Sequence, residues 1–172
     1  MSTEYMPIVP SLIIVYSPES LHVIDHDNIE STGRVFSILY HLLEGLNPRW
    51  IGSQYDVRHA TAEGGKSWQV GMKLLSPFIR TTVIKDFRWE KKGGKWKDVH
   101  VPLGEGMVDF KQYFKLVKSL NIGGPISMHF EYPVYDKANK NLSQKERRRQ
   151  TIEIMKKDLQ KLRSMLKKAG LD

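Results

Sequence analysis

The sequence predicts a parallel α/β fold, because short apolar runs alternate with longer helical patterns four times along 172 residues. The short runs are rich in β-branched residues and apolar on both faces, as expected of strands buried in a parallel sheet. The longer segments carry apolar residues at intervals of three and four, which gives a helix one buried face. With 40% apolar residues the chain can bury a core, and we expect one domain over residues 1–172.

The first half of the chain contains two of these repeats. A helix cap is expected at Ser31 or Thr32, because a hydroxyl oxygen there can accept from the free N–H groups of the first turn. Pro48 and Pro77 mark the ends of the two helices, since proline cannot continue a helix. The predicted elements are a strand at 11–16, a helix from residue 31 or 32 to about 46, a strand at 50–56 and a helix at 68–76.

The second half contains two more repeats, interrupted by an excursion. Gly93 and Gly94 lie within a polar stretch and predict the turn of a small hairpin within residues 87–108. Asp109 is the expected cap of the helix that follows. The remaining elements are a strand at 80–86, a helix at 110–120, a strand at 125–132 and a helix at 142–169, whose buried stripe is expected to be Met155, Leu159, Leu162 and Leu166.

The composition excludes several classes of protein. The chain has no cysteine, so disulfides, cysteine zinc sites and thiol nucleophiles are absent. Its apolar runs are far shorter than the roughly 20 residues that cross a bilayer. The N-terminus does not resemble a secretory signal, and we expect a cytoplasmic protein that does not bind membranes.

The positive charge is confined to the C-terminus. Residues 142–172 contain ten Lys or Arg and four Asp or Glu, which is +6 of the chain's net +8. This helix lacks the interleaved aromatic residues with which single-strand binders stack bases. The pattern is typical of a solvated helix face and disfavours nucleic acid as a partner.

Polar residues gather where the predicted strands end. The catalytic groups of α/β barrels lie at the carboxyl ends of strands, and here those ends carry Asp56, Lys85-Asp86 and Glu131. Alternation places His129 on the same strand face as Glu131. Carboxylates with a nearby histidine suit Mg²⁺, Mn²⁺ or another divalent ion, which would act as a Lewis acid beside a general base.

Simpler explanations exist for the same residues. An aspartate between a strand and a helix often only caps the helix, and Lys85 and Asp86 could form an ordinary ion pair. The chain has no Gly-x-Ser-x-Gly elbow, no Gly-x-Gly-x-x-Gly motif and no phosphate-binding loop.

Four motifs stand out along the chain: PRWIGSQYDVRHATAEGG at 48–65, VIKDF at 83–87, VPLGEGMVDF at 101–110 and ISMHFEY at 126–132. As an ordered set they resemble the sugar phosphate isomerase/epimerase family, the xylose isomerase-like TIM barrels. The resemblance covers about residues 32–171, whereas residues 1–30 match poorly. The resemblance implies a partial (β/α)₈ barrel of about four βα units, corresponding to strands five to eight, with the hairpin as an insertion.

The resemblance also implies a set of site residues. Asp56 and Glu131 match carboxylate ligands of a divalent metal (Mn²⁺, Mg²⁺, Co²⁺ or Zn²⁺), and Glu131 also matches an acid/base. The implied activity is isomerisation or epimerisation of a sugar or sugar phosphate by metal-assisted proton transfer next to a carbonyl. The expected residues are Glu131 and Lys85 for catalysis, His59, Arg58, Asp86 and Trp89 for substrate binding, and Asp56, Glu131 and His129 for the metal.

Two features depart from the family pattern. The family's metal histidine lies two residues before the Lys-Asp pair, where this chain has Val83. His129 could replace it or could be a packed core histidine. The first glutamate ligand has no clear counterpart, Glu19 and His22 being the candidates. Trp89 and Trp96 are expected either to form an aromatic wall over the sugar or to pack on the surface.

Alternatives to the isomerase follow from these departures and from length. An eight-stranded barrel needs about 250 residues, so strands one to four have no counterpart here and the chain resembles a truncated barrel. Exposed sheet edges promote association, and we expect a homo-oligomer. The second hypothesis is a non-catalytic half-barrel, and the third is cleavage of abasic DNA by the same fold, which requires more histidine ligands than the chain has.

Overall fold

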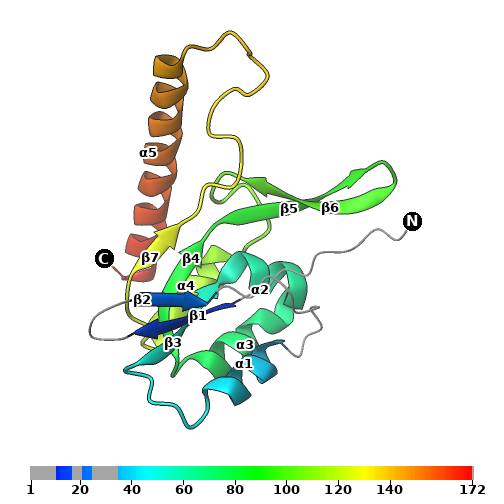
Figure 1. The fold of residues 1–172 in the computed structure, drawn as a ribbon. Helices are drawn as coiled ribbons and strands as arrows, with labels where there is room; N and C mark the ends of the chain where they lie inside the picture. The colour runs from blue at the N-terminus through cyan, green and yellow to red at the C-terminus, as the bar shows by residue number, and fades with distance from the viewer. Residues whose placement is uncertain (1–10, 17–20, 25–34, 172) are drawn as a thin grey trace. The chain divides into compact units, whose positions relative to one another are not determined.

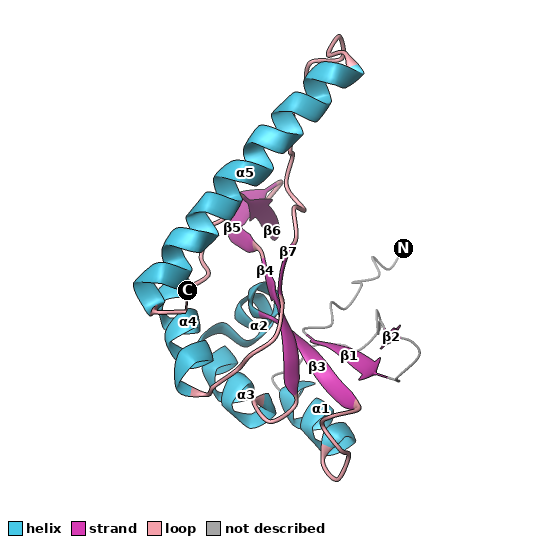
Figure 2. Cartoon of the chain, turned by 90° about the vertical axis from the view of Figure 1, so that its left-hand side faces the viewer, coloured by secondary structure: helices cyan, strands magenta, loops and turns pink. Residues whose placement is uncertain are grey.

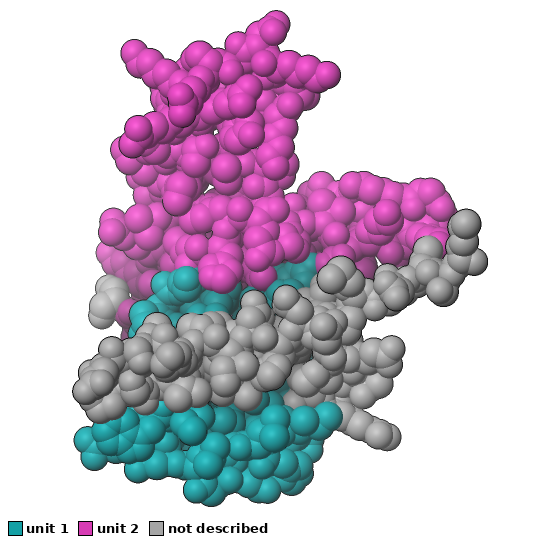
Figure 3. Space-filling view, viewed as in Figure 1, with its two compact units in different colours: residues 1–84, 119–127 teal, residues 85–118, 128–172 magenta. Residues whose placement is uncertain are grey.

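The structure is a computed structural model that describes residues 11–16, 21–24 and 35–171. It divides into two compact units, one comprising residues 1–84 and 119–127 and the other residues 85–118 and 128–172 (Figure 3). The expectation of a single domain stays a prediction. Among the described residues, no helix combines the length and the apolarity needed to cross a membrane.

The first unit is built on a five-stranded sheet in the order β2-β1-β3-β4-β7 (Figure 1). Strands β3 and β4 are parallel, as the sequence predicts, and Asp56 at the end of β3 pairs with Val83 of β4. The strands are β1 (Ser11–Tyr16), β2 (Leu21–Ile24), β3 (Ile51–Asp56), β4 (Ile79–Ile84) and β7 (Ile126–Met128).

The first strand does not begin a parallel repeat. It forms a hairpin with β2 and pairs antiparallel with β3, so the expected first βα unit is wrong. An apolar run fits a strand of either direction, and periodicity does not distinguish them. Backbone pairing with β1 satisfies the edge of β3 that would otherwise be open. The candidates Ser31, Thr32 and Glu19 lie outside the described residues, as does the side chain of His22.

Three helices pack on the sheet of the first unit, and Figures 1 and 2 show α2 and α3 on one side of β4. Tyr55 of β3 is fully buried there, with its ring stacked on Phe36 at 6.1 Å and its hydroxyl donating to the Trp68 carbonyl at 2.8 Å. The helices are α1 (Val35–Leu43), α2 (Val57–Gly64) and α3 (Trp68–Leu75), with a 3₁₀ turn at Gly65–Ser67. Helix α2 lies between the predicted strand at 50–56 and the predicted helix at 68–76, where the sequence predicts no helix or strand.

The second unit begins with the predicted hairpin, formed by β5 (Asp86–Lys92) and β6 (Lys95–Val101). Its turn is Gly93-Gly94, where both residues have positive φ values (59° and 80°). Glycine adopts this conformation without the steric cost that a side chain brings, and it suits a two-residue hairpin turn. The register is continuous from Asp86–Val101 at the base to Lys92–Lys95 at the tip.

A buried carboxylate joins this hairpin to the loop that follows it. Asp86 is 2% exposed, and each of its oxygens accepts two backbone N–H groups. Oδ1 accepts from Phe87 (2.9 Å) and Val108 (3.2 Å), and Oδ2 accepts from Gly104 and Gly106 (both 2.9 Å). A Cβ at Gly106 would collide with this carboxylate and with the Phe87 carbonyl oxygen, so glycine allows the close approach. The VPLGEGMVDF segment is therefore folded around Asp86.

Helix α4 (Phe110–Ser119) matches its prediction. Asp109 Oδ1 accepts from the backbone N–H of Gln112 at 2.9 Å, which confirms the cap. The apolar stripe is buried at Phe110, Tyr113, Phe114 and Val117.

The last two elements differ from their predictions. Strand β7 ends at Met128, so His129 and Glu131 lie beyond the regular strand and do not share a strand face. Helix α5 (Gln144–Ala169) buries Leu162, whereas Met155 and Leu159 are 40% and 39% exposed. An apolar stripe on a helix is buried only where another element covers it. Among the buried residues of α5 is also Asp158, which accepts a hydrogen bond from Tyr132.

We predict that Asp86→Asn lowers the free energy of unfolding by about 3 to 5 kcal/mol. In either orientation the new amide places its NH₂ group against two backbone N–H donors. Those two backbone donors would then have no acceptor at this position. Denaturant unfolding monitored by circular dichroism measures the loss. Asp109→Asn is the matched control, because asparagine caps helices as well as aspartate does. Equal stability of the two variants would contradict this role of Asp86.

Candidate functional site

Asp56 lies at the C-terminal end of β3 and caps helix α2. Its Oδ1 accepts from the backbone N–H groups of Arg58 (2.9 Å) and His59 (3.2 Å), and the residue is 8% exposed. Its register partner Val83 is 1% exposed. One oxygen of the predicted metal ligand is thus engaged by the helix, and the neighbouring position on β4 offers no ligand atom.

His59 is held between charged groups of the first unit. The Arg58 guanidinium approaches its Nδ1 at 3.1 Å. Because arginine can only donate, Nδ1 accepts and Nε2 carries the ring hydrogen, which faces Asp56 Oδ2 at 3.7 Å. Arg58 is 1% exposed, so its position suits orienting His59 better than contacting a substrate.

Glu63 is a buried carboxyl one helical turn beyond His59. Its side chain is 14% exposed, and its Oε1 lies 3.7 Å from His59 Nδ1. Neither carboxyl oxygen has a hydrogen-bond partner among the described residues. The pKa of Glu63 is raised from 4.5 to about 8. Burial is the largest cause, the Arg58 charge opposes it and the Asp56 charge adds to it. A carboxyl group that keeps its proton at neutral pH can donate it, as a general acid does.

Glu131 is the centre of a second cluster, in the second unit. Its Oε1 accepts from Lys85 Nζ at 2.7 Å, and its Oε2 lies 2.9 Å from His100 Nδ1. His129 Nδ1 is more distant, 3.9 Å from Oε1. Burial favours a higher pKa for Glu131, but the Lys85 hydrogen bond and the charges of Lys85, His100 and His129 outweigh it, so the pKa is lowered. The carboxylate is therefore ionised and multiply paired.

The base of the hairpin is braced by a second buried aspartate. Asp158 of α5 accepts from the Tyr132 hydroxyl at 2.6 Å and from the Leu103 N–H at 3.2 Å. Burial, followed by the Asp158 carboxylate, raises the pKa of Tyr132. A pocket of about 470 Å³ lies beside this contact, with His100 and Tyr132 among its lining residues.

The predicted site residues fall into two groups. Asp56, Arg58 and His59 meet in the first unit. In the second unit, Lys85, His129 and Glu131 meet, Asp86 is engaged by backbone N–H groups, and Trp89 lies on the hairpin. Within the described residues, no three His, Asp or Glu side chains are grouped so as to hold a metal ion.

The sequence prediction missed two residues of these clusters. Glu63 had a usable signal, because Asp56, His59 and Glu63 follow an i, i+3, i+7 spacing that places them on one helix face. Because the sequence does not predict helix α2, this spacing does not identify Glu63 in advance. His100 had no such signal, because only the hairpin register and the path of residues 129–132 bring it to Glu131.

Comparisons with known proteins identify the fold. A family model described as "Xylose isomerase-like TIM barrel" matches residues 22–165. The crystal structure of a xylose isomerase domain protein from Planctomyces limnophilus superposes with a TM-score of 0.57 at 20% identity, over 78% of this chain and 44% of that chain. The chain thus spans less than half of that relative. The crystal structure of a putative uncharacterized protein from Parabacteroides distasonis is 20% identical in sequence. That match covers 73% of this chain and 45% of that chain, with a TM-score of 0.35. A search of curated proteins gave no significant match.

We predict that Glu63→Gln stabilises the first unit progressively as the pH rises. A carboxyl group whose folded pKa is raised from 4.5 to about 8 penalises the folded state over that range, by about 1.4 kcal/mol per pKa unit. The stability difference between variant and wild type should therefore grow between these pH values and level off above them. Urea unfolding at a series of pH values measures it, with Glu44→Gln, at an exposed carboxylate of α1's C-terminal end, as the control. A difference that does not change with pH would contradict the burial penalty.

Proposed function

Because the chain belongs to the xylose isomerase-like TIM barrel family, we propose that it acts on a sugar or a sugar phosphate as an isomerase or epimerase does, by moving a proton next to the substrate carbonyl. The observation that supports this best is the Lys85–Glu131–His100 cluster. It puts an ammonium group and an imidazole each within hydrogen-bonding distance of an ionised carboxylate. These are the groups that proton transfer beside a carbonyl requires.

Each member of the cluster has a part in the proposed reaction. Glu131 is the base that takes the proton from carbon, and its side chain is 37% exposed, which leaves it open to a ligand. Lys85 lowers the basicity of Glu131 while the two are paired. A substrate carbonyl oxygen that draws the Lys85 ammonium toward itself would restore that basicity and would stabilise the developing negative charge. His100 then holds the second carboxylate oxygen in place.

The first unit holds a separate cluster, which is not part of the reaction proposed at Glu131. Arg58 orients His59 there, and the substrate-binding roles expected of these two residues stay predictions. Asp86 organises the loop around the hairpin base rather than reaching a ligand, because four backbone N–H groups occupy its oxygens.

The family resemblance implies a divalent metal, but the described residues do not fit one. Mg²⁺ and Mn²⁺ need several oxygen or nitrogen ligands. Asp56 uses Oδ1 as a helix cap, Glu131 has both oxygens in ion pairs, and Val83 replaces the expected histidine. The proposed proton transfer is therefore assigned to the side chains alone.

The second candidate function is a non-catalytic barrel fragment that binds a sugar without converting it. One observation favours it: Val83 is buried beside Asp56, so the position where the family places its metal histidine is filled by packing.

We predict that Glu131→Gln lowers the rate of proton exchange on a sugar substrate by at least ~100-fold, the effect of losing a general base. Aldoses and ketoses, free and phosphorylated, would be incubated in D₂O with the protein, and loss of the signal of the hydrogen next to the carbonyl would be followed by NMR. Glu153→Gln, at an exposed glutamate of α5, is the control and should exchange at the wild-type rate. Undiminished exchange by the Glu131 variant would refute its role as the base. A wild-type protein that binds a sugar but exchanges nothing would favour the non-catalytic alternative.

We predict that the protein retains well below one equivalent of metal per chain. The sample would be dialysed against Mn²⁺, desalted and measured by mass spectrometry of its metal content, in parallel with Asp56→Ala. Equal and negligible content in both is expected, because residues 35–171 hold no grouped set of metal ligands. Stoichiometric metal that the substitution removes would overturn the metal-free assignment.

A further inference from the structure

The register of the β5–β6 hairpin gives it one aromatic face. Side chains alternate along a strand, so Phe87 and Trp89 of β5 share a face with their register partners His100 and Asp98. Trp96 lies on the same face one step nearer the tip, opposite Lys91. The name aromatic face refers below to Phe87, Trp89, Lys91, Trp96, Asp98 and His100.

Two tryptophans on this face are exposed. Trp89 is 41% exposed and Trp96 is 63% exposed, whereas Phe87 at the base is buried. The Phe87 ring meets Trp89 edge to face, with centroids 5.9 Å apart and planes at 84°, which fixes the orientation of the indole. Exposed apolar surface of this kind is a feature of ligand-binding sites.

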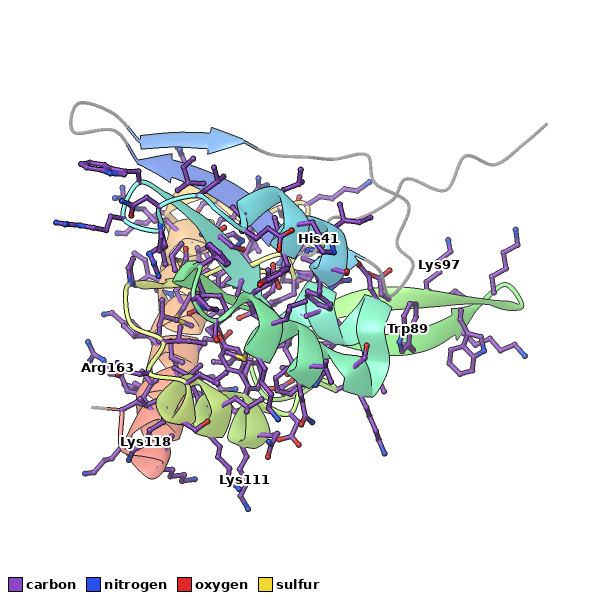
Figure 4. The ribbon with its side chains drawn as sticks, turned by 90° about the horizontal axis from the view of Figure 1, so that it is seen from below. His41, Trp89, Lys97, Lys111, Lys118 and Arg163 are labelled. Carbon is purple, nitrogen blue, oxygen red and sulfur yellow. The ribbon has the colours of Figure 1, made fainter. Side chains whose placement is uncertain are left out.

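The charges on the hairpin indicate a neutral ligand. On the aromatic face the charges of Lys91 and Asp98 cancel. The opposite face carries Arg88, Glu90, Lys92, Lys95 and Lys97, a net charge of +3. Figure 4 shows Trp89 and Lys97 on opposite sides of the hairpin.

A single-stranded nucleic acid needs cations and stacking rings on the same surface, and this hairpin separates them. A sugar ring instead offers an uncharged apolar C–H face, which an exposed indole can cover while the ring hydroxyls stay in water.

The aromatic face leads directly to the Glu131 cluster. His100 at its base lies 2.9 Å from Glu131. Trp89, which pairs with Asp98, lies two residues along the hairpin from His100, and Trp96 lies two residues further toward the tip. Each of these steps is about 7 Å at ~3.4 Å per residue. That interval is longer than a single sugar ring is wide. The two indoles therefore provide separate stacking positions along a line that starts at the carboxylate.

We propose that the aromatic face binds a substrate of at least three linked rings, an oligosaccharide, with the reacting sugar at Glu131 and the following rings over Trp89 and Trp96. This inference rests on the proposed function, because it takes Glu131 as the place where the sugar reacts. It adds the substrate class and assigns Trp96 as a determinant of specificity.

Calorimetric titration tests the inference. The full chain would be titrated with cellotriose, maltotriose and xylotriose, and with the corresponding disaccharides and monosaccharides. At least one trisaccharide should bind about tenfold more tightly than its own disaccharide, the effect of one aromatic contact of about 1.4 kcal/mol. Trp96→Ala should remove that advantage and leave disaccharide affinity unchanged. Trp50→Ala is the matched control, because Trp50 is 50% exposed and lies outside the hairpin.

The possible outcomes separate this inference from the function on which it rests. Binding of monosaccharides or disaccharides without a gain for any trisaccharide, or a gain that survives Trp96→Ala with an unchanged circular dichroism spectrum, overturns the three-ring substrate alone. If none of the sugars binds, both the sugar activity and this inference fail. Tight binding of a single-stranded oligodeoxynucleotide that is lost in Trp96→Ala would show that the face binds bases instead.

Discussion

The carboxylate of Asp86 is the interaction on which the second unit depends. Four backbone N–H groups from two separate segments converge on it, and burial makes each of these hydrogen bonds costly to lose. It fixes the base of the β5–β6 hairpin and the glycine-containing loop together. The proposed platform of Trp89 and Trp96, and the position of His100 beside Glu131, both depend on this hairpin being held in one place.

Acidic side chains have two separate roles in this chain. Asp56, Asp86 and Asp158 each accept hydrogen bonds from backbone groups, and each is nearly inaccessible to solvent. Glu63 and Glu131 instead lie close to side chains of histidine, arginine or lysine. Burial raises the pKa of Glu63 despite the Arg58 charge, whereas for Glu131 the effect of burial is outweighed by the Lys85 hydrogen bond and the neighbouring positive charges, and its pKa is lowered. A raised pKa suits a proton donor and a lowered pKa suits an ionised base. In the proposed function Glu131 is the base, whereas the three aspartates stabilise the fold through backbone hydrogen bonds.

Predictions from the sequence succeeded where a pattern is local. Gly93-Gly94 defined the hairpin turn, Asp109 defined the cap of α4, and the family motifs identified a barrel-like α/β fold that the comparisons confirm. The same reasoning failed for β1 and for the stripe of α5. An apolar strand does not encode the direction of its neighbour, and Met155 and Leu159 are equally apolar whether or not another element covers them.

The sequence by itself determined the α/β class, the partial barrel, the hairpin and which acidic residues deserve consideration, because each follows from local periodicity, turn chemistry or motif order. Only the tertiary structure decided what those residues do. It assigned Asp86 to backbone N–H groups of a distant loop, brought His100 to Glu131 and buried most of Glu63. These contacts and this burial depend on segments that are distant in the chain, and for that reason no local pattern contains them, whereas the cap at Asp56 is local.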